Sequence, residues 1–380
     1  MGDEIFYSPV FQDPAYEVTN LTLDWEINKA GELSFTIFPK NNKYNSLKIG
    51  KSVVYFYQGS NLLWSGRVSS LEYDFYNACT VRCEGCMAYL NDVISTPFTV
   101  IYKDANENNV RTTYGGASSN PGIIIKKVVE CINDTNQISD TSKHFTYRYD
   151  TTDLPTMDTY SDDELWDLND ITNSFDTAMN KLQQLLDFFG GYFKAYPTSL
   201  TENAMRYALT SSRKCSQKIE FGSNLLDISR NEKIDELFTV IYPLGKAFDE
   251  PSASGAEGRL RLPSPYVIRN ASAVAKYGEI VQAVTWDSCE TEAELRKTAQ
   301  KYLNEHSGKT LSEITIRAID LWLIDSTEDD IQLGDGIDVV SIPHNIDTEL
   351  TCIKTTINVD SPENSEYTFG EIPKGITDYS

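Results

Sequence analysis

The first 95 residues contain short runs in which apolar and polar positions alternate, a period typical of strands with one buried face. The runs are rich in β-branched and aromatic side chains, which favour extended backbone. A tight turn is expected at residues 58–61, Gln-Gly-Ser-Asn. The spacing predicts a small antiparallel barrel or sandwich from strands at residues 21–27, 32–38, 51–58, 61–73 and 78–85.

From residue 96 the apolar positions change to helical spacing. Asn120 followed by Pro121 fits an N-cap and a first turn, and the helix after it has Ile124, Ile125, Val128, Val129 and Ile132 on one face. A second helix ends at Gly190, which suits a left-handed terminator, and its apolar stripe is Ala178, Leu182, Leu185, Leu186 and Phe189. With a hairpin predicted from residues 192–196 and 205–210, residues 96–212 form an α/β insertion.

The strand pattern returns at residues 218–245 and ends in a linker-like stretch at 248–265. A further helix is predicted at residues 291–305, where Thr291 and Glu294 make a capping box. Four more strands follow, at residues 312–324, 336–342, 349–359 and 366–370.

Two stretches near opposite ends of the chain share a pattern. Residues 47–56 (LKIGKSVVYF) and 331–340 (IQLGDGIDVV) both place apolar-x-apolar-Gly-charged before a strand. Two related barrels are expected to show such an echo, with Gly50 and Gly334 each fixing the turn before the same strand.

Composition limits the classes of partner. The chain has 380 residues, which predicts two to four domains, and its 40% hydrophobic content with 22 Tyr is enough for packed cores. The net charge of −23 argues against tight nucleic-acid binding, which needs Lys and Arg. An acidic surface keeps a large assembly soluble, or lets nucleic acid pass without sticking.

The first residues, MGDEIFYSPVFQDP, have acids where a signal peptide has a basic region, and the sequence has no run apolar enough to span a membrane. We therefore expect the chain to begin in a cytoplasm, where its seven cysteines need not pair.

Cys83 and Cys86 have the three-residue spacing of thiolate metal sites and redox couples. A zinc site needs four ligands, and neither a second such pair nor a histidine pair at ligand spacing is present. A redox role needs the pair to open a long helix after a parallel strand. We interpret the stretch as a strand that runs through Gly85 into a short helical turn.

Other catalytic or metal-binding patterns are equally incomplete. The three histidines, His144, His306 and His344, lie at no ligand or nucleophile-base spacing, although Cys-His catalysis could be assembled in space. The acid-rich residues 161–170 and 334–338 lack the ligand order of an EF-hand, so we expect solvated turns. Residues 115–122 lack the Lys-Ser/Thr of a phosphate-binding loop. A carboxylate pair for glycoside hydrolysis has no fixed sequence signature. No catalytic, cofactor-binding or metal-binding residue is assigned, and no cofactor is expected.

Several stretches together resemble the tail hub family of bacteriophages, described as prophage endopeptidase tail or tail-associated lysin and similar to the central baseplate hub of contractile tails. The stretches cover nearly the whole chain and lie at residues 47–68, 81–92, 225–245, 272–287, 301–305, 318–325, 331–347 and 362–371.

The resemblance implies an α+β, mostly β chain with two tube-like antiparallel β-barrel domains. The domains it implies are a first hub β-barrel at 1–95 plus 213–245, the α/β insertion at 96–212, a linker and α/β segment at 246–305, and a second hub β-barrel at 306–380. Six glycines are expected at structural turns of these domains: Gly50, Gly66, Gly85, Gly245, Gly334 and Gly370.

By the same resemblance, three copies form a ring whose six barrels face the hexameric tail tube. The implied partners are other copies of the chain, tail tube and distal tail proteins, the tape measure protein, and spike, fibre or receptor-binding proteins. DNA passes through without sequence-specific binding, and the protein resides at the tail tip or baseplate of a virion assembled in the host cytoplasm.

The family name implies a peptidase. Longer members continue into catalytic or fibre modules after the hub, whereas this sequence stops soon after residues 366–370, so we expect no catalytic module in it. A non-enzymatic tail hub is the reading favoured here. Two alternatives stay open: a cell-wall hydrolase that uses an unrecognised carboxylate pair, and a surface adhesin that binds carbohydrate.

Overall fold

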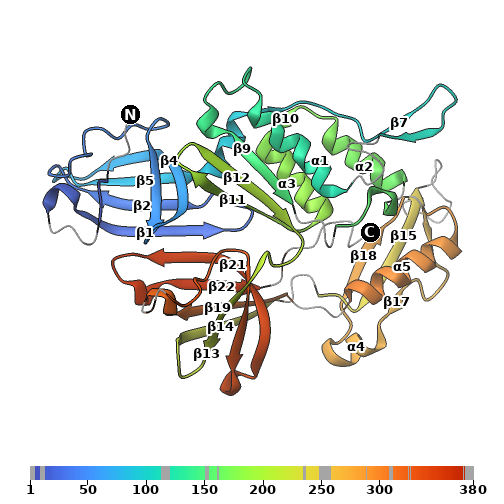
Figure 1. Cartoon of the computed structure of the whole chain (residues 1–380). Helices are drawn as coiled ribbons and strands as arrows, with labels where there is room; N and C mark the ends of the chain where they lie inside the picture. Colours follow the sequence, from blue (N-terminus) through green and yellow to red (C-terminus); the bar gives the residue numbers. More distant parts are fainter. Residues whose placement is uncertain are drawn as a thin grey trace. The chain divides into compact units, whose positions relative to one another are not determined.

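The computed structural model of the chain describes residues 5–8, 13–112, 120–149, 154–160, 162–233, 237–247, 258–287, 289–307, 311–323, 325, 327–370 and 372. It divides into two compact units, Met1–Ser229 with Ile314–Lys374 and Arg230–Glu313 with Gly375–Ser380. The first unit holds two β lobes and a helical insertion, and the second is a small α/β body (Figure 1). The expected α+β, mostly β fold class is confirmed.

The first lobe consists of five antiparallel strands in the order β1-β2-β5-β4-β3. Alternate side chains of these strands, among them Leu23, Phe35 and Val81, are buried in one core, as the two-residue period predicted. A 3-10 turn, η1 (Pro14–Tyr16), precedes them. The strands are β1 (Val18–Glu26), β2 (Glu32–Ile37), β3 (Val53–Gln58), β4 (Asn61–Tyr73) and β5 (Cys79–Gly85).

The second lobe repeats this strand order with later segments of the chain. Its path is β14-β19-β22-β21-β20, and β13 pairs in parallel with the outer edge of β20. Taken in chain order, β14, β19, β20, β21 and β22 correspond to β1 through β5. The strands are β13 (Arg213–Glu220), β14 (Leu225–Lys233), β19 (Leu311–Ala318), β20 (Asp335–Ser341), β21 (Ile346–Asn358) and β22 (Glu366–Gly370); turns η6 (Leu321–Leu323), η7 (Ile342–His344) and η8 (Pro362–Asn364) connect them.

The two lobes form one continuous sheet. Residues 354–358 of β21 pair antiparallel with residues 22–26 of β1, with Trp25 opposite Thr355, and the resulting sheet has eleven strands. Over the described residues, no strand pairing closes either lobe into a ring. Residues 213–229, expected with the first lobe, lie in the second, because Cys215 and Ile219 are buried in its core.

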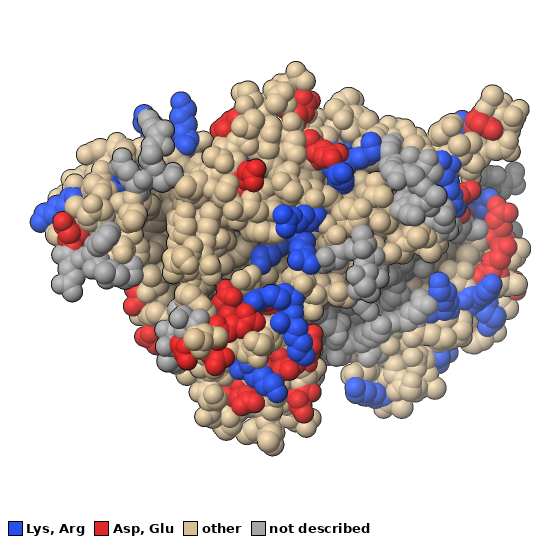
Figure 2. All heavy atoms as spheres, viewed as in Figure 1, with Lys and Arg blue, Asp and Glu red and all other residues tan. Residues whose placement is uncertain are grey.

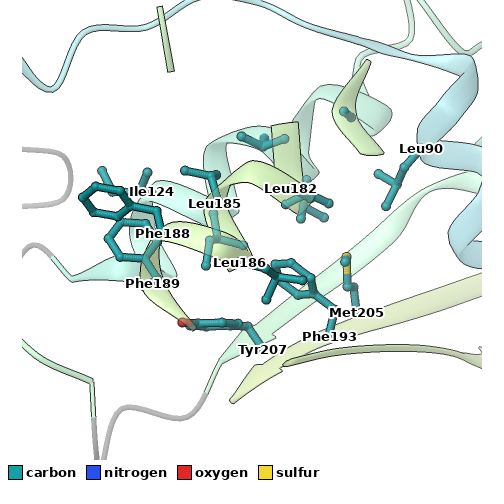
Figure 3. Packing of buried hydrophobic residues seen from close by; sticks show 14 of the residues in the cluster. Leu90, Ile124, Leu182, Leu185, Leu186, Phe188, Phe189, Phe193, Met205 and Tyr207 are labelled. Carbon is teal, nitrogen blue, oxygen red and sulfur yellow. The ribbon is translucent and has the colours of Figure 1, made fainter. Parts of the chain in front are cut away.

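The insertion packs helices on a three-stranded sheet of β11, β12 and β9, where β11 and β12 form the predicted hairpin. Figure 3 shows leucines of α3 facing Phe193, Met205 and Tyr207 on the strands. The predicted N-cap is confirmed, because the Asn120 side chain accepts from the Ile123 N–H. Gly190 follows α3 with a positive φ of 74°, but its ψ of −165° lies outside the left-handed helical region that was predicted. The elements are η2 (Cys86–Asp92), β6 (Ile94–Ser95), β7 (Ile101–Lys103), β8 (Asn109–Arg111), α1 (Pro121–Val129), η3 (Glu130–Asn133), η4 (Thr141–Lys143), β9 (Phe145–Tyr149), η5 (Met157–Thr159), α2 (Asp162–Thr172), β10 (Asp176–Thr177), α3 (Ala178–Phe189), β11 (Tyr192–Ser199) and β12 (Glu202–Ala208).

Helix α2 corrects the expectation of a solvated turn at residues 161–170. Its first turn carries Asp162, Asp163 and Glu164, where negative charge is favourable next to the helix N-terminus. Leu165 and Leu168 are buried against the insertion core, so the acids lie on one end and one face of a packed helix.

The second unit is a four-stranded sheet centred on β15, which α5 covers (Figure 1). The predicted capping box is present, since the Thr291 side chain accepts from Glu294 N–H and the Glu294 carboxylate accepts from Thr291 N–H. Its elements are β15 (Val240–Ala247), β16 (Arg259–Arg261), β17 (Ile268–Arg269), α4 (Ala271–Tyr277), β18 (Val281–Thr285) and α5 (Glu292–His306).

Among the helices described, none combines the length and the apolar character that a membrane span requires.

Candidate functional site: the charged junction at Gly334

The six glycines expected at turns occupy two kinds of position. Gly50 and Gly334 lie in turns with φ of 73° and 84°. The other four, Gly66, Gly85, Gly245 and Gly370, lie in strands or at their ends. A Cβ atom on Gly85 would lie 1.9 Å from the Ala30 carbonyl oxygen, so backbone crowding explains that glycine. The structure does not gather the six into one site.

Gly50 and Gly334 make the same contact in the two lobes. The Gly50 N–H donates to the Val68 carbonyl oxygen of β4, and the Gly334 N–H donates to the Cys352 carbonyl oxygen of β21, both at 2.8 Å. Each turn leads into a short strand, β3 or β20, that pairs with the long strand it has just contacted. The faint echo in the sequence therefore marks a repeated structural element.

At Gly334 the second lobe meets the insertion. The Lys194 ammonium on β11 donates to the Leu333 carbonyl oxygen at 2.8 Å, and the Tyr192 hydroxyl donates to the Gly334 carbonyl oxygen at 3.4 Å. Leu333 is only 1% exposed and packs in the core cluster of the first lobe. The turn thus joins three parts of the first unit.

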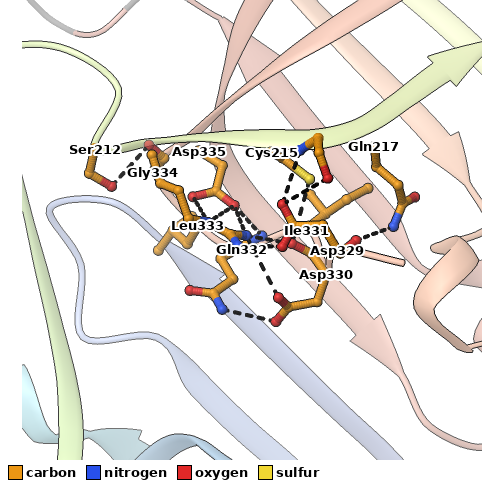
Figure 4. A network of polar contacts seen from close by, with 12 residues as sticks. Ser212, Cys215, Gln217, Asp329, Asp330, Ile331, Gln332, Leu333, Gly334 and Asp335 are labelled. Carbon is orange, nitrogen blue, oxygen red and sulfur yellow. Dashed lines mark hydrogen bonds and ion pairs between the residues drawn. The ribbon is translucent and has the colours of Figure 1, made fainter. Parts of the chain in front are cut away.

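Arg213 anchors the turn to β13. Its Nε lies 3.1 Å from Asp335 Oδ1, and its Nη2 lies 2.5 Å from Asp335 Oδ2. Its Nη1 also donates to Asp329 Oδ1 at 2.5 Å. Figure 4 shows Asp329, Asp330 and Asp335 of this network together. Hydrogen bonds to these carboxylates, that of Asp335 foremost, raise the pKa of Arg213, so it stays charged.

Asp335 corrects the expectation of a solvated turn at residues 334–338. Its side chain is 2% exposed, and besides Arg213 it accepts the Gln332 N–H at 2.9 Å. Burial raises the pKa of Asp335, while the Arg213 hydrogen bonds oppose that rise. A buried carboxylate needs such pairing, because an isolated buried charge is costly.

A second buried acid continues the network along β13. Gln217 Nε2 donates to Asp320 Oδ1 at 2.7 Å and also to the Asp329 carbonyl oxygen. Asp320 is 2% exposed and accepts the Trp322 N–H at 3.0 Å. Burial raises the pKa of Asp320. Residues 320–335 are therefore held to β13 by polar contacts at several points.

Lys194 on β11 is a further charged side chain of the junction. Its ammonium lies 5.2 Å from the Trp25 ring centroid and 5.8 Å from that of Tyr196, both within cation-π range. Burial lowers the pKa of Lys194 to about 8, although Asp335 and Cys352 favour its charged form.

The cysteine pair of residues 83–86 is structural. Cys83 lies on β5 and Cys86 opens η2, and both are buried. Burial raises the pKa of each thiol to about 12, which disfavours the thiolate that redox chemistry needs. All seven cysteines are free.

The described histidines make local contacts. His144 Nε2 lies 3.2 Å from the Ile138 carbonyl oxygen, and His344 Nδ1 lies 2.6 Å from Ser341 Oγ. His306 ends α5, but its side chain is outside the described residues. Within the described parts of the chain, no three His, Cys, Asp or Glu side chains are grouped as a metal ion requires.

Figure 2 shows acidic and basic side chains side by side on one face of the second lobe. Lys214 on β13 pairs there with Asp338 at 2.9 Å and Glu349 at 2.8 Å.

The junction residues Lys194, Arg213 and Asp320 were not singled out from the sequence. The only signal was Asp335, which directly follows the glycine of the echo. Chemically, the junction is built to hold segments together.

The chain resembles proteins of phage tails. Residues 213–380 match the family described as prophage endopeptidase tail. No curated protein sequence matches the chain.

Solved structures with a similar fold include three prophage or bacterial tail proteins. Prophage tail protein gp18 from Listeria monocytogenes EGD-e is 14% identical with a TM-score of 0.50, over 95% of this chain and 90% of that one. The 43 kDa tail protein of prophage MuSo2 from Shewanella oneidensis is 12% identical with a TM-score of 0.53, over 92% and 93%. A tail protein from Neisseria meningitidis MC58 is 11% identical with a TM-score of 0.51, over 93% and 91%. Residues 213–380 thus match the prophage endopeptidase tail family, and the fold of the chain is similar to that of prophage tail proteins.

Proposed function

We propose that this phage tail protein is a structural hub at the tail tip or baseplate, where three copies form a ring with a pseudo-sixfold outline. The observation that carries the proposal is the repeated strand order, β1-β2-β5-β4-β3 in one lobe and β14-β19-β22-β21-β20 in the other. Two similar lobes in each of three copies present six similar surfaces, which suits a hexameric tube.

In this proposal the ring joins the tail tube and distal tail proteins on one side to spike, fibre or receptor-binding proteins on the other. The tape measure protein is a further candidate partner, and assembly takes place in the cytoplasm of the bacterial host. DNA passes through the ring during ejection, and the net charge of −23 per copy disfavours binding to its phosphates.

The proposed hub domains are built around the two repeated lobes. Residues 18–85 supply the strands of the first, and residues 213–229 with 314–370 supply most of the second. The junction at Gly334 connects the second lobe with the insertion through the hydrogen bond from Lys194 to the Leu333 carbonyl oxygen, and the Arg213–Asp335 ion pair fixes the junction to β13.

We assign the chain a non-enzymatic role. Its acids at the junction are engaged by Arg213 or Gln217. At the separate Cys83 and Cys86 pair, the raised pKa of both thiols disfavours a reactive thiolate. Purified chain incubated with peptidoglycan should release no soluble fragments. Release that disappears when single acids are substituted would instead establish the cell-wall hydrolase.

The ring is tested on purified protein by light scattering coupled to size exclusion, followed by negative-stain images. The expected mass is three times the 42.8 kDa of one chain, and the expected particle is a ring with a six-lobed outline. A monomer that binds glycans would favour the adhesin, and a monomer at every concentration contradicts the ring.

A further inference from the structure

We infer that the aromatic turn, residues 73–78 between β4 and β5, is a docking surface for a homotrimeric tail protein that presents apolar pockets within a basic surface. The inference rests on the proposed ring, because three copies of the chain would present three such turns. It goes beyond the ring by naming the class of partner that fits one end of the lobes.

Three aromatic side chains of this turn are exposed. Phe75 is 91% exposed, Tyr76 is 81% exposed and Tyr73 is 56% exposed. The Phe75 and Tyr76 rings meet edge to face, with their centroids 5.2 Å apart. Rings this exposed bury little apolar area within the chain, and neighbouring apolar side chains on a surface mark an interaction site. Aromatic residues are also enriched in the buried centres of protein interfaces.

The backbone under these rings is held in one conformation. Asp74 Oδ1 accepts the Tyr76 N–H at 2.8 Å. The Tyr44 hydroxyl donates to the Asn77 carbonyl oxygen at 2.6 Å, and the Tyr44 ring centroid lies 6.1 Å from that of Tyr73. A turn that is ordered before it binds loses less conformational entropy on binding, so more of its buried apolar area contributes to affinity.

The strand register places the turn between β21 and β22 at the same end of the sheet. Cys79 of β5 lies opposite Ile37 of β2, which lies opposite Val18 of β1. In the second lobe Asn358 of β21 lies opposite Thr22 of β1, in antiparallel orientation. The aromatic turn directly precedes Cys79, and the β21–β22 turn directly follows Asn358. Both turns therefore lie toward the Val18 end of β1.

The β21–β22 turn is the counterpart of the aromatic turn in the repeat, because β21 and β22 correspond to β4 and β5. It has no aromatic residue, since residues 359–365 are Val-Asp-Ser-Pro-Glu-Asn-Ser. Around the proposed ring, aromatic and polar turns therefore alternate at this end. A sixfold partner would meet two different surfaces there, whereas a threefold partner meets three identical ones. The partner that the aromatic turns fit is a homotrimer.

The charges at this end define the surface of that partner. The register brings four described segments together here: residues 13–17 before β1, 38–46 after β2, 72–78 and 359–365. Their acids are Asp13, Glu17, Glu72, Asp74, Asp360 and Glu363, and their lysines are Lys40 and Lys43. Six acids and two lysines give these segments a net charge of −4. Lys and Arg around the apolar pockets of the partner would complement this charge.

The test compares three forms of the full chain. Phe75→Ser with Tyr76→Ser removes both rings without a change in charge. The matched control, Tyr102→Ser with Phe175→Ser, removes one tyrosine and one phenylalanine from the insertion, where they are 46% and 77% exposed. Because all four side chains are exposed, circular dichroism, thermal unfolding and the mass from light scattering should match the wild type.

Each homotrimeric tail protein of the same phage is purified and immobilised in turn, and its hexameric tail tube protein is the comparison. One homotrimer should bind the wild type and the control equally, and the Phe75/Tyr76 variant at least about tenfold more weakly, because aromatic side chains dominate the affinity of many interfaces. Binding of the tube protein should be the same for all three forms.

A charge variant tests the basic surface of the partner. Glu72→Gln with Glu363→Gln removes two exposed acids, one from each turn. It should bind the homotrimer more weakly than the wild type at low salt and equally at high salt, because salt screens the lost attraction. Equal binding at low salt would overturn the basic surface that we assign to the partner.

Full binding of the Phe75/Tyr76 variant to the homotrimer would overturn the docking surface. So would a loss of tube binding in this variant, or a wild type that binds none of the homotrimers. A wild type with the mass of three chains leaves the proposed ring standing in each of these cases. A wild type that stays monomeric contradicts the ring itself, and the threefold argument with it.

Discussion

The Arg213 guanidinium grips the Asp335 carboxylate through Nε at 3.1 Å and Nη2 at 2.5 Å, and this carboxylate is 2% exposed. The two residues open the parallel pair of β13 and β20, to which they bring segments 122 positions apart in the sequence. Arg213 thus allows the charged Asp335 side chain to be buried at the start of β20, where the β20–β21 hairpin of the second lobe begins.

Removing this guanidinium should destabilise the fold strongly. Arg213→Ala leaves the buried Asp335 carboxylate with the Gln332 N–H but without its guanidinium partner; breaking a fully buried pair costs about 3–5 kcal/mol of unfolding free energy, which is the upper bound here because Arg213 is 36% exposed. Urea unfolding followed by tryptophan fluorescence measures the loss. The control is Lys214→Ala, one residue further along β13, whose ion pairs are exposed and should contribute little. Equal effects of the two substitutions would show that the Asp335 pair is not a buried anchor.

Lys194 should make stability depend on pH in the alkaline range. Its pKa is lowered on folding from 10.5 to about 8, so between these values the unfolded chain holds a proton that the folded chain has released. Lys194 therefore contributes most to the unfolding free energy above pH 10.5, where it is neutral in both states. This contribution is lost as the pH falls through about 8. The difference in unfolding free energy between wild type and Lys194→Met should therefore rise with pH, by at most about 1.4 kcal/mol per pH unit.

Lys214 provides the control with the opposite sign. The hydrogen bonds that the Lys214 ammonium donates to Glu349 and Asp338 raise its pKa. Its contribution to stability is therefore full below the unfolded pKa and is lost as the pH rises through the folded pKa. Replacing Lys214 by Met should give a difference that falls, not rises, at alkaline pH. Parallel curves for the two lysines would contradict the burial of Lys194.

The two repeated turns should respond differently to the same substitution. Gly50→Ala places a Cβ at φ of 73° in open space, so its cost is backbone strain alone, about 1–2 kcal/mol. Gly334→Ala adds a Cβ 2.9 Å from the Tyr192 hydroxyl oxygen, at φ of 84°, so it should cost more. Denaturant midpoints of the two variants measure the difference. A larger loss for Gly50→Ala would mean that Gly334 and Tyr192 do not pack as described.

Local patterns predicted the elements whose burial repeats along a single segment. The five strands of the first lobe and the helix around Leu182 were found because their apolar period is set by neighbours in sequence. Helix α2 was missed because its acids were interpreted as a solvated charge run, although Leu165 and Leu168 are buried and Trp166 and Ile171 pack against the insertion core. The echo at Gly50 and Gly334 was visible because a positive φ demands the same residue in both lobes.

The partners across the fold could not be predicted from the sequence. Whether β13 pairs with the first or the second lobe depends on contacts such as Arg213 with Asp335, and two oppositely charged residues far apart have no shared local signature. The same holds for Lys194, whose surroundings combine Trp25 of β1 with the Leu333 carbonyl. Long-range choices of this kind appear only when the chain is folded.

The cysteines should be inert in the native protein. Burial raises the pKa of Cys83, Cys86 and Cys215 to about 12, and a thiol reacts with a disulfide reagent only as its thiolate. Cys131 is partly exposed, and the other six cysteines are buried. At pH 8, Cys131 of the native chain should therefore react first with an aromatic disulfide reagent, and the coloured thiolate that is released measures the reaction. A Cys131→Ser variant should react slowly. Urea should expose seven thiols in the wild type and six in the variant. Rapid reaction of the native Cys131→Ser protein would contradict this prediction and favour a reactive pair at Cys83 and Cys86.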